Sequence, residues 1–281
     1  MRAALIQLTV TDDPGENLAS VQGMIRTSVA SGADFILTPE MTNCLSSSRD
    51  HQRSVYHHEE DDPTLAALRD MAAASGKYLL IGSLGLLTHD ADGRFANRSF
   101  LIGPDGGILA RYDKIHMFDV TVSETEVYRE SAGYRPGARA VVSETPFGKV
   151  GMAVCYDLRF PHLFRRLAQA GAGILTVPAA FNDTTGRAHW ETLLRARAIE
   201  NGCFVLAPAQ TGFHREAHGR GRRTWGHSLA IAPWGEVIAD GGTEPGVTLA
   251  DLDLSQIDRA RGRVPALTHD RDFGGPSSGP A

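Results

Sequence analysis

Short apolar runs alternate with amphipathic stretches along the chain, and this pattern predicts strands that alternate with helices. The runs expected to form strands are Ala3–Leu8, Asp34–Thr38, Tyr78–Leu86, Ser99–Ile102, Ala140–Ser143, Lys149–Val154, Ile174–Val177, Phe204–Ala207, Ser228–Ile231 and Val247–Asp251. The stretches expected to form helices are Asn17–Ser31, Pro63–Ala74, a segment that opens at Pro161, and Arg187–Asn201. This alternation indicates an α/β protein, built either as two sheets with helices on their outer faces or as one doubly wound sheet.

The chain shows neither an internal repeat nor a linker, so we expect a single domain over residues 1–272. The last nine residues, 273–281, are rich in glycine, serine and proline and contain one large apolar residue, Phe273. Such a segment cannot bury enough apolar surface to fold, and we expect a disordered tail.

Charge and composition exclude several classes of protein. A net charge of -5 gives no global attraction to nucleic acid or to an anionic membrane. No apolar run approaches the roughly 18–20 residues that span a bilayer, and the first residues do not resemble a signal peptide. The three cysteines, Cys44, Cys155 and Cys203, are far apart and odd in number, which argues against a disulfide framework and favours the cytoplasm.

Three residues with complementary chemistry follow predicted strands. Cys155 ends the run KVGMAVC, Glu40 follows DFILTP, and Lys114 lies in RYDKIHMF after the strand and turn of residues 99–107. Ligands usually bind at the carboxyl ends of the strands in open α/β sheets. Taken singly, each residue also fits an ordinary structural role: a core cysteine, a paired carboxylate and a solvated lysine.

Together the three residues can hydrolyse an amide bond. Cysteine is a nucleophile near neutral pH, and glutamate can accept its proton and later protonate the departing amine. A lysine ammonium lowers the pKa of a nearby thiol and stabilises the oxyanion that forms on the attacked carbonyl. The sequence thus suggests a catalytic triad of Glu40, Lys114 and Cys155.

The motifs FILTPEM, YDKIHMFDV and VGMAVCYDLRFPHLF resemble the three signatures of the nitrilase superfamily, the carbon–nitrogen hydrolases. The resemblance runs from Ala3 to about Asp272. It implies a four-layer αββα sandwich, a Glu–Lys–Cys triad, and subunits that pair into a homodimer or a multiple of dimers. Glu130, in YRESAGYRPG, matches a second glutamate that orients the lysine, and the backbone N–H of Tyr156 matches an oxyanion-hole donor.

The second half of the chain is similar to the deaminated-glutathione amidase and ω-amidase branch of this superfamily, in CYDLRFPHL, the stretch from PAAFNDTTG, and WGHSLAIAPWGEV. The branch implies cleavage of the distal amide of an α-keto dicarboxylic acid through a thioester, without a metal or an organic cofactor. Such a substrate needs a cation for its remote carboxylate, and Arg159 and Arg222 are candidates. Phe181 is a candidate apolar wall. The basic stretch FHREAHGRGRRTW is longer than we expect in close relatives and is expected to border the pocket entrance. The sequence therefore predicts the type of reaction more narrowly than the substrate.

Other functions are compatible with parts of this sequence. A nitrilase or a general aliphatic amidase would use the same triad, and a silent binding protein would have no need of it. A Cys–His hydrolase that pairs Cys155 with His162 or His227 leaves Glu40 and Lys114 unexplained.

The HREAH stretch, with His214, Glu216 and His218, lacks the helical HExxH order of a zinc protease, so we expect no metal site. The cluster Arg220, Arg222 and Arg223 lacks interleaved aromatic residues, so we expect no nucleic-acid binding.

Overall fold

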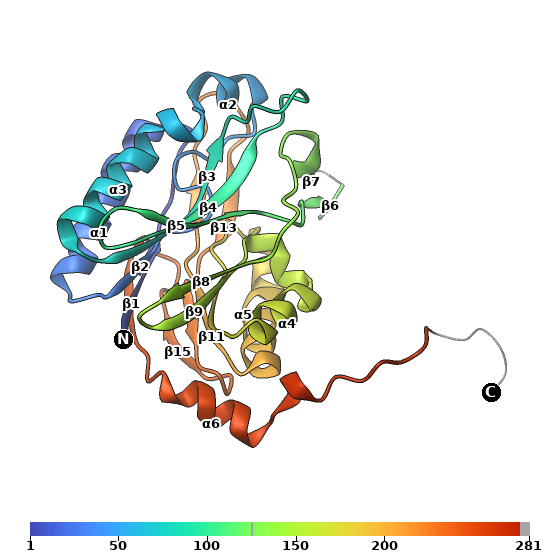
Figure 1. Ribbon diagram of the computed structural model, residues 1–281. Helices are drawn as coiled ribbons and strands as arrows, with labels where there is room; N and C mark the ends of the chain where they lie inside the picture. Colours follow the sequence, from blue (N-terminus) through green and yellow to red (C-terminus); the bar gives the residue numbers. More distant parts are fainter. Residues whose placement is uncertain (125, 276–281) are drawn as a thin grey trace.

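The computed structural model describes residues 1–124 and 126–275. Within them, two six-stranded sheets pack face to face and helices cover their outer faces (Figure 1). The first sheet has the order β16-β1-β2-β3-β4-β5 and the second the order β15-β14-β11-β10-β9-β8. The expected αββα sandwich is therefore confirmed, and the alternative of one doubly wound sheet is wrong.

The strands of the first sheet are β1 (Arg2–Gln7), β2 (Phe35–Leu37), β3 (Tyr78–Leu86), β4 (Ala96–Ile102), β5 (Ile108–Asp113) and β16 (Gly246–Asp251). Those of the second are β8 (Val141–Thr145), β9 (Gly148–Met152), β10 (Ala172–Thr176), β11 (Phe204–Ala207), β14 (Leu229–Ile231) and β15 (Val237–Asp240). Two hairpins pair β6 (Asp119–Thr121) with β7 (Val127–Arg129), and β12 (Thr211–His214) with β13 (Arg222–Trp225). The helices are α1 (Pro14–Ala30), α2 (Arg49–Val55), α3 (Pro63–Ser75), α4 (Pro161–Gln169), α5 (Asp183–Asn201) and α6 (Ser255–Arg263).

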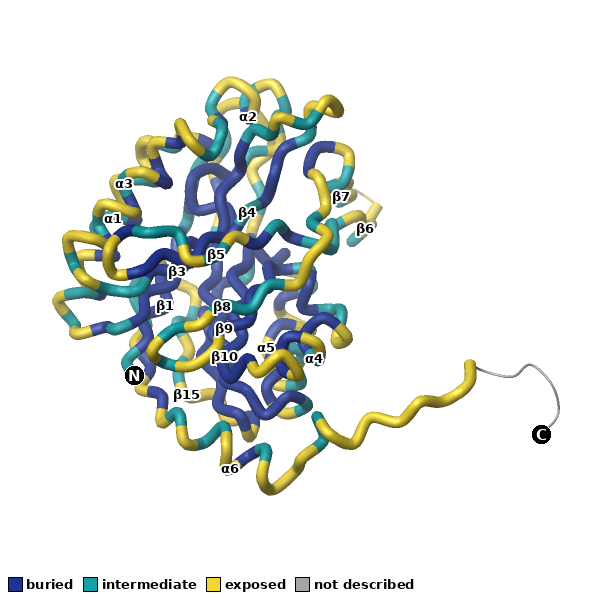
Figure 2. The backbone as a smooth tube through the Cα atoms, in the orientation of Figure 1, coloured by how far each residue is buried: buried dark blue, intermediate teal, exposed yellow. Residues whose placement is uncertain are grey.

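Burial on both faces explains why the central strands read as continuous apolar runs. In β1, Ala3 and Leu5 belong to the core between the two sheets, whereas Ala4 and Ile6 belong to the core under α1 and α3. Successive side chains of a strand point to opposite faces, so a strand covered on both sides shows no polar alternation. Figure 2 shows the central strands buried and the outer helix faces exposed.

Local signals set the helix ends, although α1 begins at Pro14 and α5 at Asp183, ahead of the expected starts at Asn17 and Arg187. The side chain of Asp13 accepts hydrogen bonds from the N–H groups of Gly15 and Glu16 at the start of α1. Gly76 ends α3 in the left-handed conformation with φ 65°, and Pro161 occupies the first position of α4. The sequence did not reveal α2, β5, either hairpin, β15 or α6.

The C-terminal tail is only partly described. Residues 273–275 are exposed and belong to no helix or strand, and residues 276–281 lie outside the described part of the chain. The expectation of a disordered tail therefore stays a prediction. Within the described residues, none of the helices combines the length and the apolar character needed to cross a bilayer.

Candidate active site

Glu40 lies just beyond β2, where the first sheet meets the second. Its side chain is almost completely buried. Oε2 accepts a hydrogen bond of 2.8 Å from the backbone N–H of Ala180, and Oε1 accepts one of 2.9 Å from Asn97 Nδ2. Burial is the largest effect and would raise the pKa of this carboxyl, but the charge of Lys114 and the hydrogen bonds from Lys114, Cys155 and the Ala180 N–H together hold the pKa below its ordinary value. Glu40 is therefore ionised at neutral pH and fixed in place.

Lys114 follows β5 directly and points between two carboxylates. Its Nζ lies 2.9 Å from Glu40 Oε1, and 3.0 and 2.9 Å from the two oxygens of Glu130. Burial would lower the pKa of this ammonium, yet the charges of Glu130 and Glu40 raise it well above its ordinary value. Lys114 stays charged, and the sharing of its three N–H groups between two carboxylates leaves at most one for a substrate oxygen.

Glu130 is held by groups other than the lysine. It sits in a short 3₁₀ turn directly after β7. Its Oε2 accepts a hydrogen bond of 2.6 Å from the backbone N–H of Phe118, and its Oε1 accepts one of 3.3 Å from Asn97. Asn97 thus bridges the two carboxylates that flank Lys114.

Cys155 stands at a sharp turn after β9. Its φ is 50°, in the left-handed region that residues with a side chain rarely adopt, and its N–H donates to the carbonyl of Pro178 at 2.9 Å. The turn presents the sulfur to the cavity and starts the 3₁₀ helix Cys155–Arg159. Tyr156 occupies the first turn of this helix, where backbone N–H groups have no helical partner.

The sulfur of Cys155 is a neutral thiol in the resting protein. Burial raises its pKa, and the charge of Glu40 raises it further, while Lys114 lowers it by less. Lys114 lowers the pKa of the thiol, as expected, but burial and the charge of Glu40 outweigh its effect. The proton stays on sulfur, hydrogen-bonded to the ionised Glu40, which is the arrangement required for general-base activation.

Asp157 joins the lysine segment to the cysteine turn. Its carboxylate is fully buried. Oδ2 accepts from the Tyr112 hydroxyl at 2.7 Å and from the Val154 N–H at 2.9 Å, and Oδ1 accepts from the N–H of His116 at 3.0 Å. Tyr112 and His116 flank Lys114 on the chain. Because Asp157 binds both of them, its side chain fixes the position of Lys114 relative to Cys155.

A cavity of about 320 Å³ opens onto these residues. Glu40, Lys114, Glu130 and Cys155 all line it, and so do Tyr156, Phe181 and Arg222. Arg159 is absent from the lining. Its guanidinium lies instead over the Tyr156 and Phe181 rings, 5.8 and 5.4 Å from their centroids, with Nη1 3.3 Å from His189 Nδ1.

The basic loop between β12 and β13 borders the cavity mouth. Glu216, which lines the cavity, accepts hydrogen bonds from the N–H and hydroxyl of Ser47 at 2.7 and 2.8 Å. Asp12 Oδ2 accepts from the N–H groups of Ala217 and His218 at 2.8 and 3.1 Å. The loop is thus attached to two other segments that lie far away in the sequence.

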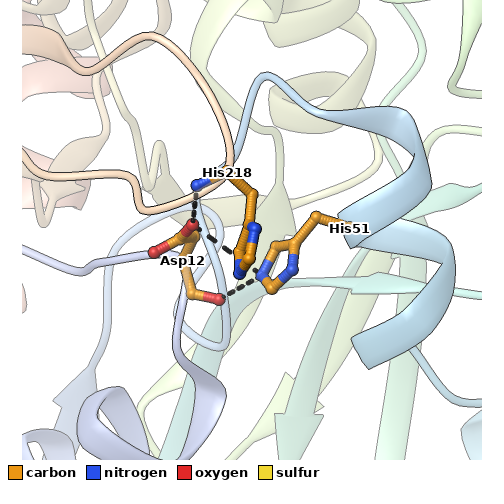
Figure 3. A group of neighbouring side chains, drawn as sticks. All are labelled: Asp12, His51 and His218. Carbon is orange, nitrogen blue, oxygen red and sulfur yellow. Dashed lines mark hydrogen bonds and ion pairs between the residues drawn. The ribbon is translucent and has the colours of Figure 1, made fainter.

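His218, which belongs to this loop, lies beside Asp12 and His51 in a compact group (Figure 3). Their candidate ligand atoms lie within 4.8 Å of one another, which is a spacing that a metal ion can bridge. His51 Nε2, however, lies 2.7 Å from the carbonyl oxygen of Asp12 and must donate to it, and the rings of His51 and His218 stack at 4.4 Å. The hydrogen bonds of this group therefore hold the loop in place.

His214 takes no part in that group. Its Nδ1 donates to the carbonyl of Val10 at 2.8 Å, and its Nε2, 2.7 Å from Thr224 Oγ1, then accepts from the hydroxyl. Both ring nitrogens are occupied, and His214 lies at the end of β12 rather than on a helix. The HREAH stretch therefore does not bind a metal through this histidine.

Sequence reasoning missed Asn97 and Asp157. Asn97 lies in β4, just before the strand that was expected to begin at Ser99, and no spacing rule marks it. Asp157, two residues after Cys155, carried a signal, because a buried carboxylate in an apolar segment needs partners.

The comparisons with known proteins agree over nearly the whole chain. A family model described as carbon–nitrogen hydrolase matches residues 2–262. The deaminated glutathione amidase of Yersinia enterocolitica is 39% identical over 269 residues, covering 95% of this chain and 92% of that protein. An omega-amidase of Homo sapiens is 33% identical over 270 residues, covering 96% and 95%.

Solved structures give the same result for the fold. Saccharomyces cerevisiae Nit3, a member of branch 10 of the nitrilase superfamily, aligns with a TM-score of 0.84 at 28% identity over 97% of both chains. Fold, family model and similarity over the whole length all lead to one conclusion: this chain belongs to the carbon–nitrogen hydrolase family of the nitrilase superfamily.

Proposed function

We propose that the protein hydrolyses the distal amide of an α-keto dicarboxylic acid through a thioester on Cys155. One observation carries this proposal above all: a buried Lys114 is fixed between Glu40 and Glu130 in the cavity that Cys155 lines. Similarity to deaminated glutathione amidases and omega-amidases supports the choice of substrate.

In the proposed acylation step, Glu40 takes the thiol proton while the sulfur attacks the amide carbon. The ammonium of Lys114 and the N–H of Tyr156 stabilise the oxyanion. As the C–N bond breaks, Glu40 passes the proton to the departing nitrogen, which leaves as ammonia or an amine, and a thioester remains.

In the proposed hydrolysis step, the ionised Glu40 takes a proton from a water molecule that attacks the thioester carbon. The C–S bond breaks, the acid departs, and the sulfur regains the proton from Glu40. Glu130 touches neither reacting atom in this scheme, and its role is to hold Lys114 charged and oriented.

Recognition of the acyl group is proposed to depend on Arg222 and Phe181, which line the cavity, with Arg159 behind the Phe181 ring. We further propose that subunits pair into a homodimer or a multiple of dimers. The buried, unpaired state of Cys44, Cys155 and Cys203 supports a cytoplasmic location.

The test supplies purified protein with α-ketoglutaramate, deaminated glutathione, a plain aliphatic amide and a nitrile, and identifies products by mass spectrometry. We expect cleavage of a keto-acid amide, and no turnover by Cys155→Ala. Turnover of the aliphatic amide or the nitrile alone would overturn the substrate and favour the alternatives that share the triad. Equal activity of the wild type and Cys155→Ala would overturn the mechanism.

A further inference from the structure

The outer part of the cavity is positively charged. Arg49, Arg129 and Arg222 line it, and within residues 1–124 and 126–275 none of them forms an ion pair with a carboxylate. The cavity lining holds four cations, Arg49, Lys114, Arg129 and Arg222, against three carboxylates, Glu40, Glu130 and Glu216, so its net charge is +1. A cavity with this balance of charge favours an anionic ligand.

Arg49 is the best fixed of these arginines. It is the first residue of α2 and is half-buried. Its guanidinium lies over the Tyr134 ring, 5.1 Å from the centroid, and its Nη1 donates to the neutral Gln52 at 3.0 Å. A guanidinium held against an aromatic ring with N–H groups still available can bind a carboxylate through two hydrogen bonds.

The position of Arg49 relates it to the leaving amine. Glu40, Met41, Leu45, Ser47 and Arg49 line the cavity along one stretch of chain that runs outward from Glu40. Because Glu40 protonates the departing nitrogen in the proposed mechanism, the amine portion of a substrate lies along this wall.

Arg222 belongs to a different wall. Its guanidinium lies over Tyr128, 5.8 Å from the ring centroid, and Tyr128, Asn182 and Phe181 line the cavity beside it. Phe118 connects this wall to Tyr156, since its ring centroid lies 4.9 Å from that of Tyr128 and 5.1 Å from that of Tyr156. The wall therefore adjoins Cys155, the neighbour of Tyr156, which carries the acyl group in the thioester. The two arginines can therefore serve the two ends of one substrate.

We propose that Arg49 binds a carboxylate on the leaving amine and so determines which leaving groups the protein prefers. The inference rests on the proposed function and deepens it. A primary amide such as α-ketoglutaramate lacks that carboxylate and leaves Arg49 unused.

The test compares substrates that differ only at the end of the leaving group. One pair is the γ-amides of α-ketoglutarate with glycine and with glycinamide, and a second pair has glutarate in place of α-ketoglutarate. The variant Arg49→Met removes the charge. The matched control Arg53→Met removes a cation from the same helix that lies over Phe95 at 5.5 Å but does not line the cavity.

A second variant displaces Arg49 without replacing it. A Cβ added to Gly133 would lie 1.6 Å from Arg49 Cζ, so Gly133→Ala forces the guanidinium to move. The backbone at Gly133, with φ -128°, accepts alanine. The free energy of unfolding of each variant, measured in urea, identifies any variant that fails to fold.

We expect Arg49→Met to lower kcat/KM for the glycine amide about 10- to 100-fold, as expected for loss of a charged hydrogen-bond partner. The glycinamide rate should stay unchanged, Gly133→Ala should act in the same direction, and Arg53→Met should leave the ratio of the two rates unchanged. The proposal is overturned if the wild type does not prefer the carboxylate, or if Arg49→Met lowers both rates equally.

The two pairs separate this inference from the proposed function. Cleavage of the glutarate pair without the α-ketoglutarate pair would contradict the proposed acyl group, while the glycine-to-glycinamide ratio still tests Arg49. If neither pair turns over, calorimetric binding to Cys155→Ala, with and without Arg49→Met, measures the same ratio. Equal binding of glycine amide and glycinamide, or no binding of either, would then overturn the role of Arg49.

Discussion

The ammonium of Lys114 lies 2.9 Å from Oε1 of Glu40, and both side chains are almost completely buried. Removal of one partner leaves the other as an uncompensated charge in the interior, which typically costs about 3–5 kcal/mol. An alanine at either position therefore tests stability as much as catalysis. Glu40→Gln keeps the size of the side chain and is the better probe of the base.

Glu40→Gln should separate turnover from thiol reactivity. Loss of the base should lower amide hydrolysis by at least about 100-fold. Loss of its negative charge should lower the pKa of the Cys155 thiol, because Glu40 is among the groups that raise it. The rate of alkylation by iodoacetamide at pH 8 should therefore be kept or increase, and a parallel fall in both rates would contradict this account.

Iodoacetamide should label Cys155 ahead of the other two cysteines. Cys155 lines the cavity, whereas Cys44 and Cys203 are completely buried and burial raises their pKa to about 12 and about 11. Peptide mass spectrometry after a timed reaction measures the order of labelling. Equal labelling of all three in the folded protein would show that the cavity does not expose the sulfur.

Asn97 is expected to position the two carboxylates. Its amide donates to Glu40 at 2.9 Å and to Glu130 at 3.3 Å. Asn97→Asp would place a third negative charge between them and raise the pKa of Glu40, so the acid limb of kcat/KM should move to higher pH. Asn97→Ala should reduce kcat with a smaller shift of that limb, and the pH profiles of the two variants distinguish a positioning role from a purely structural one.

His214 should make the stability depend on pH. Burial lowers its pKa from 6.5 to about 4, so below pH 6.5 the unfolded chain takes up a proton that the folded protein refuses. The contribution of His214 to the free energy of unfolding is complete above pH 6.5 and is lost as the pH falls from 6.5 to 4. At pH 5 the loss is about 2 kcal/mol. Urea unfolding at pH 7.5 and 5 should show a smaller loss for His214→Gln than for the wild type, and equal losses would refute the assignment.

Asp12→Ala should release the loop between β12 and β13. Asp12 accepts the N–H groups of Ala217 and His218, and loss of these bonds leaves the loop tied mainly by Glu216 and Ser47. Trypsin should then cleave faster after Arg215 and Arg220, and KM should rise because the loop borders the cavity. Unchanged cleavage at these arginines would mean that Glu216 alone holds the loop.

Much of the sandwich could be predicted because its central strands have a strong local signal. Tyr78–Leu86 and Phe204–Ala207 were expected with the bounds that the structure has. The strand β5 was missed because polar residues such as Arg111 interrupt its apolar pattern, and β15 was missed because it has four residues and ends on the exposed Asp240. The helix α2 has one fully buried residue, Gln52, and therefore lacks an apolar stripe.

The site could be predicted only as far as its residues carry chemistry in recognisable motifs. The motifs indicated Glu40, Lys114, Glu130 and Cys155, and the structure brings these four together. Asn97 and Arg49 belong to no such motif, since their positions depend on how separate segments pack. The raised pKa of Cys155 follows from burial and from the closeness of Glu40, and neither can be read from a linear sequence.

The last strand of the sandwich pairs with the first, since β16 lies beside β1 with Arg2 opposite Asp251. Glu40 and Lys114 follow strands of this first sheet, whereas Cys155 follows a strand of the second. A ribosome must therefore release almost the entire polypeptide before the sheet that carries the base and the lysine is complete. We therefore expect a newly made or refolding molecule to gain catalytic activity late. The time at which activity appears would report when the two sheets pack together.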